Sequence, residues 1–404
     1  MRGLVAIVLV TALLAGCGGA PILANPPAAQ PSVPTPTEAP PTPNDPIPVV
    51  LPRDDGPHER LMEWWYYTGH LVAIHQRAPS YVRRLPRYGF EFVVFRGERG
   101  AFPIIWASHF ALTDETGQRF HYAQRAEIGD SVDRSALLTD GTSLGFDFEL
   151  SGTDPSRPAS VERPPWQMSG ANGSDRLRVT LAPDEAAAAG LTSLHLALEL
   201  DSRKPPALHD EDGWIDFGAA GSSYYYSRTS MDAVGTMTLG DTMFRVEGDA
   251  WFDHQWGDFI TVGGGGWDWF AVNLDDGTDV TLSQVRDADG SYPLVYGTLV
   301  DPGGTSHHLE RDDFTIEATA RWTSPETGAT YPAAWHITVG EDLVIDLVPT
   351  VADQELDTRA STGVVYWEGS QLVSARRTTR RSEIKLGGEA YVELTGYAPA
   401  ALTP

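Results

Sequence analysis

Residues 58–71 read HERLMEWWYYTGHL and place two tryptophans and two tyrosines at consecutive positions. Successive side chains of a β-strand point to opposite faces, so Trp65 and Tyr67 share one face while Trp64 and Tyr66 share the other. Covering only one face would leave costly aromatic surface in water. We therefore predict a strand in a barrel wall that meets a second barrel, beside a cavity for an apolar ligand. A packed barrel core is the alternative role for both tryptophans.

The chain beyond residue 53 is predicted to be β-rich throughout. Short aromatic or β-branched segments alternate with turn signals such as Asp275-Asp276-Gly277, a pattern typical of antiparallel barrels or sandwiches. The best helical segment, residues 183–189, is short. The expected strands are 88–96, 101–112, 145–152, 177–182, 194–200, 243–259, 267–274, 279–287, 292–300, 314–322, 333–340, 343–349, 363–369 and 390–397.

Each half of the chain contains one strongly aromatic segment. MEWWYYTGHL at residues 62–71 is matched in the second half by DAWFDHQWGDF at residues 249–259. This weak internal similarity indicates two copies of one barrel type. We expect an N-terminal barrel over residues 54–235 and a C-terminal barrel over residues 236–404.

EWWYYTGHL (63–71) and WFDHQWGDF (251–259) resemble the AttH and carotenoid 1,2-hydratase (CrtC-type) family in content, order and separation. Tyr224-Tyr225-Tyr226-Ser227 and Trp267-Asp268-Trp269 also resemble family positions. The resemblance covers about residues 54–404 and implies an all-β chain of two tandem lipocalin-like antiparallel barrels. It also implies an apolar isoprenoid, carotenoid or lipid ligand. Family members hydrate carotenoids, catalyse cyclisations or have no assigned reaction, so the resemblance bears more on fold than on chemistry.

Hydration of an isolated alkene requires a carboxyl that stays protonated, and aromatic faces beside the carbocation that forms. Asp253 and Asp268 are our candidate acids, and His254 with Trp256 resembles the family's His-x-Trp pair near a proposed catalytic aspartate. Asp253 and His254 are adjacent and point to opposite faces, so only a bulge would bring them together. A core histidine and an aspartate bridging the barrels are the structural alternatives. The candidate ligand contacts are Trp64, Trp65, Tyr67, His109, Tyr225, Trp256, Trp267 and Trp269.

The first residues predict export. Residues 1–16 combine Arg2 with an apolar run that is too short for the roughly 20 helical residues of a membrane span, as in a signal peptide. Leu14-Ala15-Gly16-Cys17 resembles a bacterial lipobox, which predicts lipidation at Cys17, and residues 17–53 form a proline-rich spacer. We expect a lipoprotein anchored in the membrane on its extracytoplasmic side; a plain secretory signal is the alternative.

The net charge of −26 disfavours binding to nucleic acid or to anionic lipid surfaces. No H-E-x-x-H, P-loop or dinucleotide motif occurs, and no cofactor or metal is predicted. Three hypotheses remain: an alkene hydratase, a carrier that binds an apolar molecule without changing it, and a cyclase-like or pericyclase-like enzyme.

Overall fold

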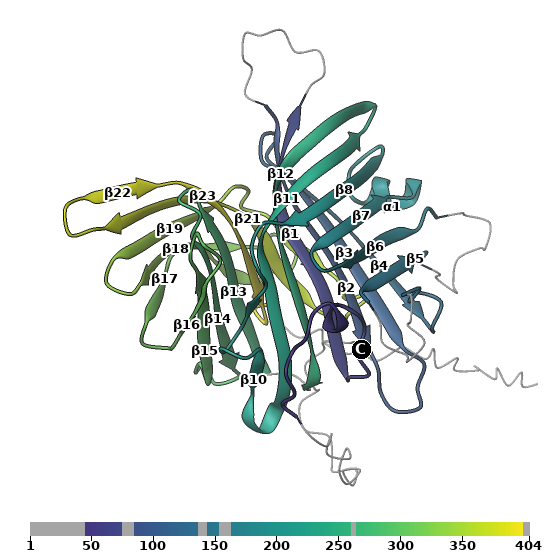
Figure 1. The fold of residues 1–404 in the computed structure, drawn as a ribbon. Helices are drawn as coiled ribbons and strands as arrows, with labels where there is room; N and C mark the ends of the chain where they lie inside the picture. Colours follow the sequence, from purple (N-terminus) through teal and green to yellow (C-terminus); the bar gives the residue numbers. More distant parts are fainter. Residues whose placement is uncertain (1–44, 75–84, 136–143, 153–162, 260–263, 399–404) are drawn as a thin grey trace, which may run out of the picture.

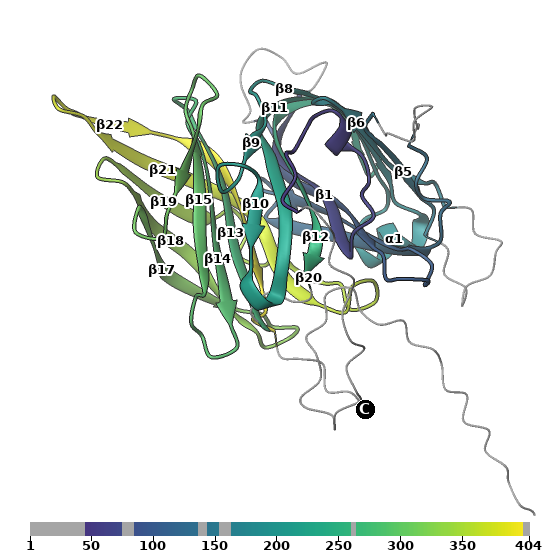
Figure 2. The ribbon, with the colours of Figure 1, turned by 60° about the horizontal axis from the view of Figure 1, so that its bottom comes forward.

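The computed structural model describes residues 45–74, 85–135, 144–152, 163–259 and 264–398. Two antiparallel sheets of twelve and eleven strands lie side by side (Figures 1 and 2). The first sheet curls into a nearly closed barrel, and the second is a half-barrel. The prediction of an all-β, lipocalin-like fold is confirmed. The candidate signal sequence, lipobox and Cys17 lie outside the described residues.

The first sheet has the strand order β4-β3-β2-β1-β12-β11-β8-β7-β6-β5, with β9 and β10 added beside β11. Among the described residues one short α-helix, α1 (Pro183–Ala188), lies within this half of the chain, and no helix there or in the second half could span a membrane. The strands are β1 (Met62–Ile74), β2 (Arg87–Gly97), β3 (Ile105–Asp114), β4 (Arg119–Ile128), β5 (Phe146–Leu150), β6 (Trp166–Ala171), β7 (Ser174–Thr180), β8 (Leu194–Ser202), β9 (Ala207–Leu208), β10 (Trp214–Asp216), β11 (Gly221–Leu239) and β12 (Thr242–Phe259), with 3-10 turns η1 (Arg53–Asp55) and η2 (Gly218–Ala220).

The second sheet has the order β16-β15-β14-β13-β23-β21-β19-β18-β17, with β20 and β22 beside β21. Within the described residues its edge strands, β16 and β17, do not pair with each other, so this sheet does not close into a barrel. Its strands are β13 (Gly264–Leu274), β14 (Asp279–Asp287), β15 (Leu294–Val300), β16 (Ser306–Leu309), β17 (Phe314–Thr323), β18 (Thr330–Val339), β19 (Leu343–Pro349), β20 (Glu355–Asp357), β21 (Val365–Thr378), β22 (Glu383–Leu386) and β23 (Gly388–Thr395).

The two aromatic segments that suggested a repeat are neighbours in one sheet. β1 pairs with β12 so that Trp65 lies opposite His254. The first sheet therefore continues to Phe259, and the expected boundary at residue 235 falls inside β11. The second aromatic segment completes the wall of the first barrel. It does not begin the second barrel. Both segments have aromatic side chains on two faces, and in this wall one face is covered by the barrel interior and the other by the second sheet.

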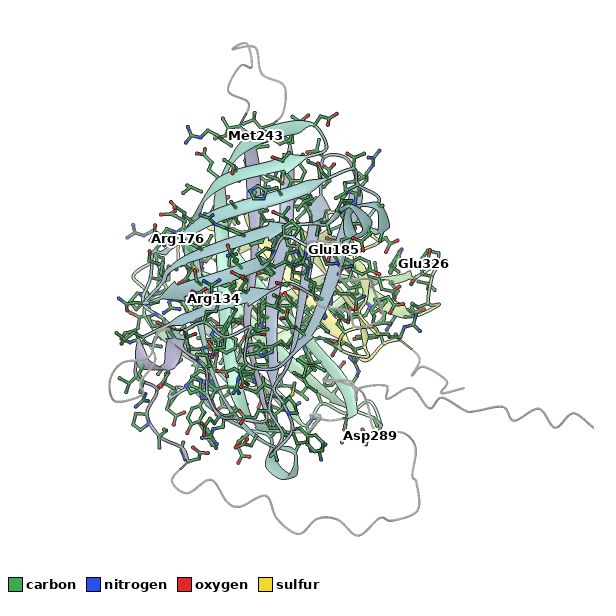
Figure 3. All side chains as sticks on the ribbon, turned by 90° about the vertical axis from the view of Figure 1, so that its right-hand side faces the viewer. Arg134, Arg176, Glu185, Met243, Asp289 and Glu326 are labelled. Carbon is green, nitrogen blue, oxygen red and sulfur yellow. The ribbon has the colours of Figure 1, made fainter. Side chains whose placement is uncertain are left out.

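The described residues contain five clusters of buried apolar side chains, and three of them define this arrangement. One fills the first barrel, and a second covers the concave face of the second sheet. A third lies between the sheets, where Tyr66 and Trp251 contact Trp269 and Tyr391. Polar residues such as Arg134 and Arg176 lie on the side of the first sheet that faces away from the second (Figure 3). The protected region between the sheets contains the candidate site.

Candidate functional site

A cavity of about 380 Å³ lies between the outer faces of the two sheets. Cavities of this size that are mostly apolar and hold a few polar groups are typical of small-molecule sites. Its walls come from both sheets: Leu61, Met62, Trp64, Tyr66, Glu91, Phe95, Gly97, Glu98, Arg99, Phe102, Pro103, Ile105, Phe217, Tyr225, Asp253, Gln255, Phe259, Trp267, Trp269, Ser283, Val285, Tyr296, Tyr366, Glu368 and Glu393.

Strand alternation divides the aromatic run of β1 between two environments. Trp64 and Tyr66 line the cavity, whereas Trp65 and Tyr67 are fully buried inside the first barrel. The Trp65 ring packs against Phe148 at 4.5 Å between centroids. Of the three predicted contacts in this run, Trp64 lines the cavity, whereas the predictions for Trp65 and Tyr67 are wrong because both point into the barrel; Tyr66, which was not predicted, also lines the cavity.

Three buried carboxyls, Glu91 on β2, Asp253 on β12 and Glu368 on β21, line this cavity together with the half-buried Glu393 on β23. No lysine, arginine or histidine in the described part of the chain forms an ion pair with any of them. Buried carboxyls without a cation favour the protonated form. This cavity wall therefore has an unusual capacity to hold protons.

Burial and neighbouring carboxyls raise the pKa of each of the three glutamates. Glu368 and Glu393 are direct cross-strand neighbours, a position in which two negative charges repel. Burial, together with the neighbouring charge of Glu393, raises the pKa of Glu91 to about 8. Burial and the charge of Asp253 raise the pKa of Glu393 to about 7. Burial and the charges of Glu91 and Glu393 place the pKa of Glu368 well above its ordinary value.

Asp253 has a different environment. Its Oδ1 accepts hydrogen bonds from the indole of Trp251 at 2.7 Å and from the hydroxyl of Ser227, and its Oδ2 accepts one from Tyr225 at 2.7 Å. Tyr225 itself accepts a bond from Trp269 at 3.1 Å, so its own proton is directed to Asp253. Burial raises the pKa of Asp253 to about 6, while the three donors favour its ionised form. Asp253 is therefore the carboxyl best suited to be an anion at neutral pH.

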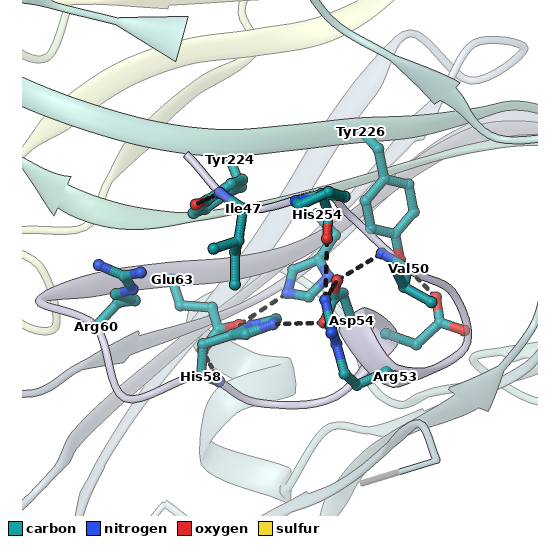
Figure 4. Close-up of polar contacts among 12 residues, drawn as sticks. Ile47, Val50, Arg53, Asp54, His58, Arg60, Glu63, Tyr224, Tyr226 and His254 are labelled. Carbon is teal, nitrogen blue, oxygen red and sulfur yellow. Dashed lines mark hydrogen bonds and ion pairs between the residues drawn. The ribbon is translucent and has the colours of Figure 1, made fainter. Parts of the chain in front are cut away.

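His254 and Trp256 lie inside the first barrel, on the face of β12 opposite Asp253. Glu63 Oε1 accepts hydrogen bonds from His254 Nε2 at 2.9 Å and from His58 Nδ1 at 2.7 Å (Figure 4). The His58 ring also stacks on Trp256. Among the described residues, His58, Glu63 and His254 form the group that could hold a metal ion, and their candidate ligand atoms lie within 4.8 Å of one another. Within the part of the chain that the structure describes, however, no acceptor binds the Nδ1 of His254, so the hydrogen bond that usually orients a metal-binding histidine is lacking.

This inner cluster attaches the segment before β1 to the barrel. Asp55 accepts hydrogen bonds from Tyr226 at 2.5 Å and from Arg228 at 2.6 Å, and Arg60 pairs with Asp45 at 2.8 Å. Burial opposes ionisation of Glu63, but the charge of His58 and the two histidine hydrogen bonds outweigh it and lower the Glu63 pKa. Its carboxylate is charge-compensated, unlike the carboxyls of the cavity.

Asp268 lies outside the residues that line the cavity. Its Oδ1 accepts hydrogen bonds from Arg286 at 3.0 Å and from Tyr397 at 2.9 Å. The flanking Trp267 and Trp269 line the cavity, as alternation requires. Burial raises the pKa of Asp268, and the charge of Arg286 opposes that rise. A carboxylate held by an arginine in this way is a poor proton donor.

His109, another candidate contact, is fully buried and reaches the cavity through Tyr366, whose hydroxyl lies 2.8 Å from His109 Nδ1. Tyr225 lines the cavity and holds Asp253. Sequence reasoning missed the glutamates and Tyr366. Each glutamate stands within an apolar strand, as in GFEFVVF (89–95), VVYWEG (364–369) and AYVELTG (390–396), and an acidic residue in such a run was the available signal.

The proteins that this chain resembles share its fold. The AttH-like family model matches residues 41–397. A crystal structure of a putative AttH from Nitrosomonas europaea is 26% identical, covers 88% of this chain and 99% of its own, and has a TM-score of 0.69. Kievitone hydratase from Nectria haematococca is 15% identical over 86% of this chain and 93% of its own, with a TM-score of 0.56. CghA with Sch210972 is 12% identical over 83% and 89%, with a TM-score of 0.50. No curated protein sequence matches the chain.

Proposed function

The chain belongs to the AttH-like family, and on that premise we propose that its cavity binds an apolar ligand and hydrates a carbon–carbon double bond in it. One observation carries the proposal. Glutamates whose pKa is raised by burial, and an aspartate held by three hydrogen-bond donors, line a single aromatic cavity between the sheets. Carboxyls whose environments separate their pKa values are suited to act as acid and base. The name of kievitone hydratase, a structural neighbour, agrees in reaction type, although that likeness concerns the fold alone.

The glutamate cluster supplies the proton. Glu91, Glu368 and Glu393 are too close and too buried to ionise together, so the cluster retains protons at neutral pH. One of these protons passes to an alkene carbon, and the electrons of the double bond form the new C–H bond. The other alkene carbon becomes a cation. The indole faces of Trp64 and Trp269 stabilise it by up to about 2 kcal/mol each where water is excluded.

Asp253 completes the reaction as a base. A water molecule forms the new C–O bond with the cation and loses one proton to the Asp253 carboxylate. The alkene thus gains one water, a glutamate loses a proton and Asp253 gains one. Proton exchange with solvent then restores both carboxyls. The contribution of a positioned acid or base to such a step is about a hundredfold to ten-thousandfold in rate.

The ligand class follows from the lining, which is mainly aromatic and aliphatic. Isoprenoids, carotenoids and unsaturated lipids have this character and reside in membranes. An exported, lipid-anchored protein, as residues 1–17 predict, would meet such molecules at a membrane surface. No cofactor is needed for the proposed reaction.

Product analysis tests the proposal. The full-length protein is incubated with a lipid extract of its source cells, and bound and free compounds are compared by mass spectrometry. We expect a compound heavier by one water, formed by the wild type and lost in Glu368→Gln and Asp253→Asn. Glu355→Gln is the matched control, because Glu355 is also a buried glutamate bonded to a tyrosine, Tyr331 at 2.8 Å, and does not line the cavity. If the Glu368→Gln and Asp253→Asn variants formed as much product as the wild type, the proposal would be contradicted.

The same experiment separates the other two functions. A compound that co-purifies with unchanged mass and unchanged retention identifies a carrier, which the apolar lining also suits. Unchanged mass with altered retention identifies a cyclisation. Either result would overturn hydration.

A further inference from the structure

A continuous chain of hydrogen bonds connects the cavity to the far side of the sheet interface. Glu91 Oε1 lies 3.0 Å from the Tyr366 hydroxyl, which lies 2.8 Å from His109 Nδ1. His109 Nε2 lies 3.0 Å from Ser361 Oγ, which lies 2.8 Å from Gln124 Oε1. Glu91 lines the cavity, whereas Ser361 and Gln124 are only partly buried. The chain therefore runs from a candidate acid to a position near solvent.

The outer end determines the direction of these bonds. Gln124 Nε2 donates to the carbonyl oxygen of Asp357 at 2.7 Å, which orients the amide with Oε1 toward Ser361. The Ser361 hydroxyl also lies 3.2 Å from the carbonyl oxygen of Thr358. Both oxygens can only accept, so the single Ser361 proton is directed to one of them. Ser361 Oγ must then accept a hydrogen bond from His109 Nε2.

The same reasoning extends to the cavity. His109 is fully buried with no carboxylate in hydrogen-bond contact, and burial lowers its pKa to about 3, so the ring is neutral. With a proton on Nε2, its Nδ1 accepts from the Tyr366 hydroxyl. Tyr366 has a single hydroxyl proton, so when that proton is directed to His109 the 3.0 Å contact with Glu91 is a hydrogen bond only if the carboxyl carries a proton. This arrangement agrees with the pKa of about 8 to which burial raises Glu91.

We propose that Tyr366, His109 and Ser361 form a proton relay through which Glu91 exchanges its proton with solvent. This inference rests on the proposed hydration and identifies Glu91 as the glutamate whose proton the solvent replaces. In the outward direction Glu91 gives its proton to Tyr366 as Tyr366 gives its own to His109 Nδ1, and His109 releases its Nε2 proton to Ser361, whose proton leaves to solvent. The reverse transfers bring a solvent proton to Glu91 and restore the Nε2–H tautomer of His109.

The relay conserves charge at every bond. His109 receives a proton on Nε2 as it releases one from Nδ1, so a buried imidazolium does not persist. Tyr366 likewise receives a proton as it gives one to Glu91. His109 thus acts on the ligand only through Tyr366 and Glu91 and is a positioning residue.

Hydrogen–deuterium exchange of the Glu91 carboxyl tests the relay without any ligand. The infrared band of the protonated carboxyl is assigned by subtracting the spectrum of Glu91→Gln from that of the wild-type full-length protein near pH 7. Its shift is then followed after rapid mixing with D₂O. We expect exchange to be about tenfold slower, or more, in Tyr366→Phe and His109→Phe, because each removes one hydrogen-bonded link. Tyr331→Phe, which removes a buried hydroxyl bonded to Glu355, should exchange at the wild-type rate.

A second measurement needs no variant in the relay. Nitrogen-15 NMR of the wild type should show His109 neutral, with its proton on Nε2. A proton on Nδ1, the absence of a protonated Glu91 band, or equal exchange rates in wild type and Tyr366→Phe would each overturn the relay. The exchange experiment involves no turnover, so its failure is distinguishable from a failure of the hydration proposal, which product analysis decides.

Discussion

The inside of the first barrel and the cavity between the sheets place buried carboxyls in opposite electrostatic environments. On the inner face, Glu63 accepts hydrogen bonds from His58 and His254, and its pKa lies below the ordinary value. On the outer side, Glu91 and Glu368 have tyrosine partners but no cation, and their pKa values are raised. Burial is nearly complete in both places. The partner, and not the burial, determines whether a carboxyl here is ionised.

This difference assigns separate roles to adjacent residues. Asp253 and His254 are neighbours in sequence, yet Asp253 lines the ligand cavity and His254 stabilises the barrel interior. Trp64 and Trp65 are divided in the same way. Substitutions of neighbouring residues on the two faces should therefore have different effects, on stability inside the barrel and on ligand binding or protonation in the cavity.

The largest difference is expected between the two tryptophans. Trp65→Ala should lower the free energy of unfolding by about 3–5 kcal/mol, because it leaves a cavity in a packed core. Trp64→Ala should cost much less stability and weaken binding of an apolar fluorescent ligand, because Trp64 is only partly buried and lines the cavity. Urea unfolding and fluorescence titration measure the two effects. Equal losses of stability in the two variants would contradict the placement of Trp65 in the barrel core and of Trp64 in the cavity wall.

Removing the inner carboxylate is expected to have the next largest effect. Glu63→Gln should destabilise the protein by about 2–3 kcal/mol, since hydrogen bonds from His58 and His254 lose their charged acceptor. Glu91→Gln should leave stability near pH 6 unchanged, because a glutamine amide can donate to Tyr366 as a protonated glutamate does. Chemical denaturation at one pH compares the two variants. A larger loss in Glu91→Gln would indicate that Glu91 is ionised in the folded state.

The cavity glutamates should make stability fall as pH rises. The ordinary pKa of 4.5 applies to Glu91 in the unfolded chain, and burial raises it to about 8 in the folded protein. The folded state therefore binds more protons between these values, and its stabilisation is lost as pH rises through about 8. Between roughly pH 6 and pH 8, wild type should lose on the order of 2 kcal/mol more than Glu91→Gln. Parallel stability profiles for the two proteins would refute the raised pKa.

The smallest effect is expected at Asp268. Asp268→Asn should reduce stability by about 1 kcal/mol, because Arg286 keeps hydrogen bonds to the carbonyl oxygens of Gly265 and Thr395. Binding of the fluorescent ligand should be unchanged, since Asp268 does not line the cavity. Loss of product in this variant would restore Asp268 as a candidate acid.

Much of the arrangement could be predicted from local patterns. Period-two alternation and turn residues predicted the strands, and aromatic residues on both faces of 62–71 predicted that β1 would lie between two apolar environments. Alternation also predicted the separation of Asp253 from His254. The similarity between residues 62–71 and 249–259 was misleading as evidence for a repeat, because strands with similar composition can also pair within one sheet.

The sequence by itself determined which residues alternate along each strand, because side-chain direction in a strand is a local property of the backbone. It therefore determined that this chain would form aromatic-walled β-sheets with carboxyls embedded in them. Only the tertiary structure decided which carboxyls meet. Glu91 and Glu368 are far apart in the chain and come from different sheets, and their mutual repulsion exists only after the sheets pack. Protonation at this site is a consequence of that packing, since burial and neighbouring charge are properties of the assembled interface.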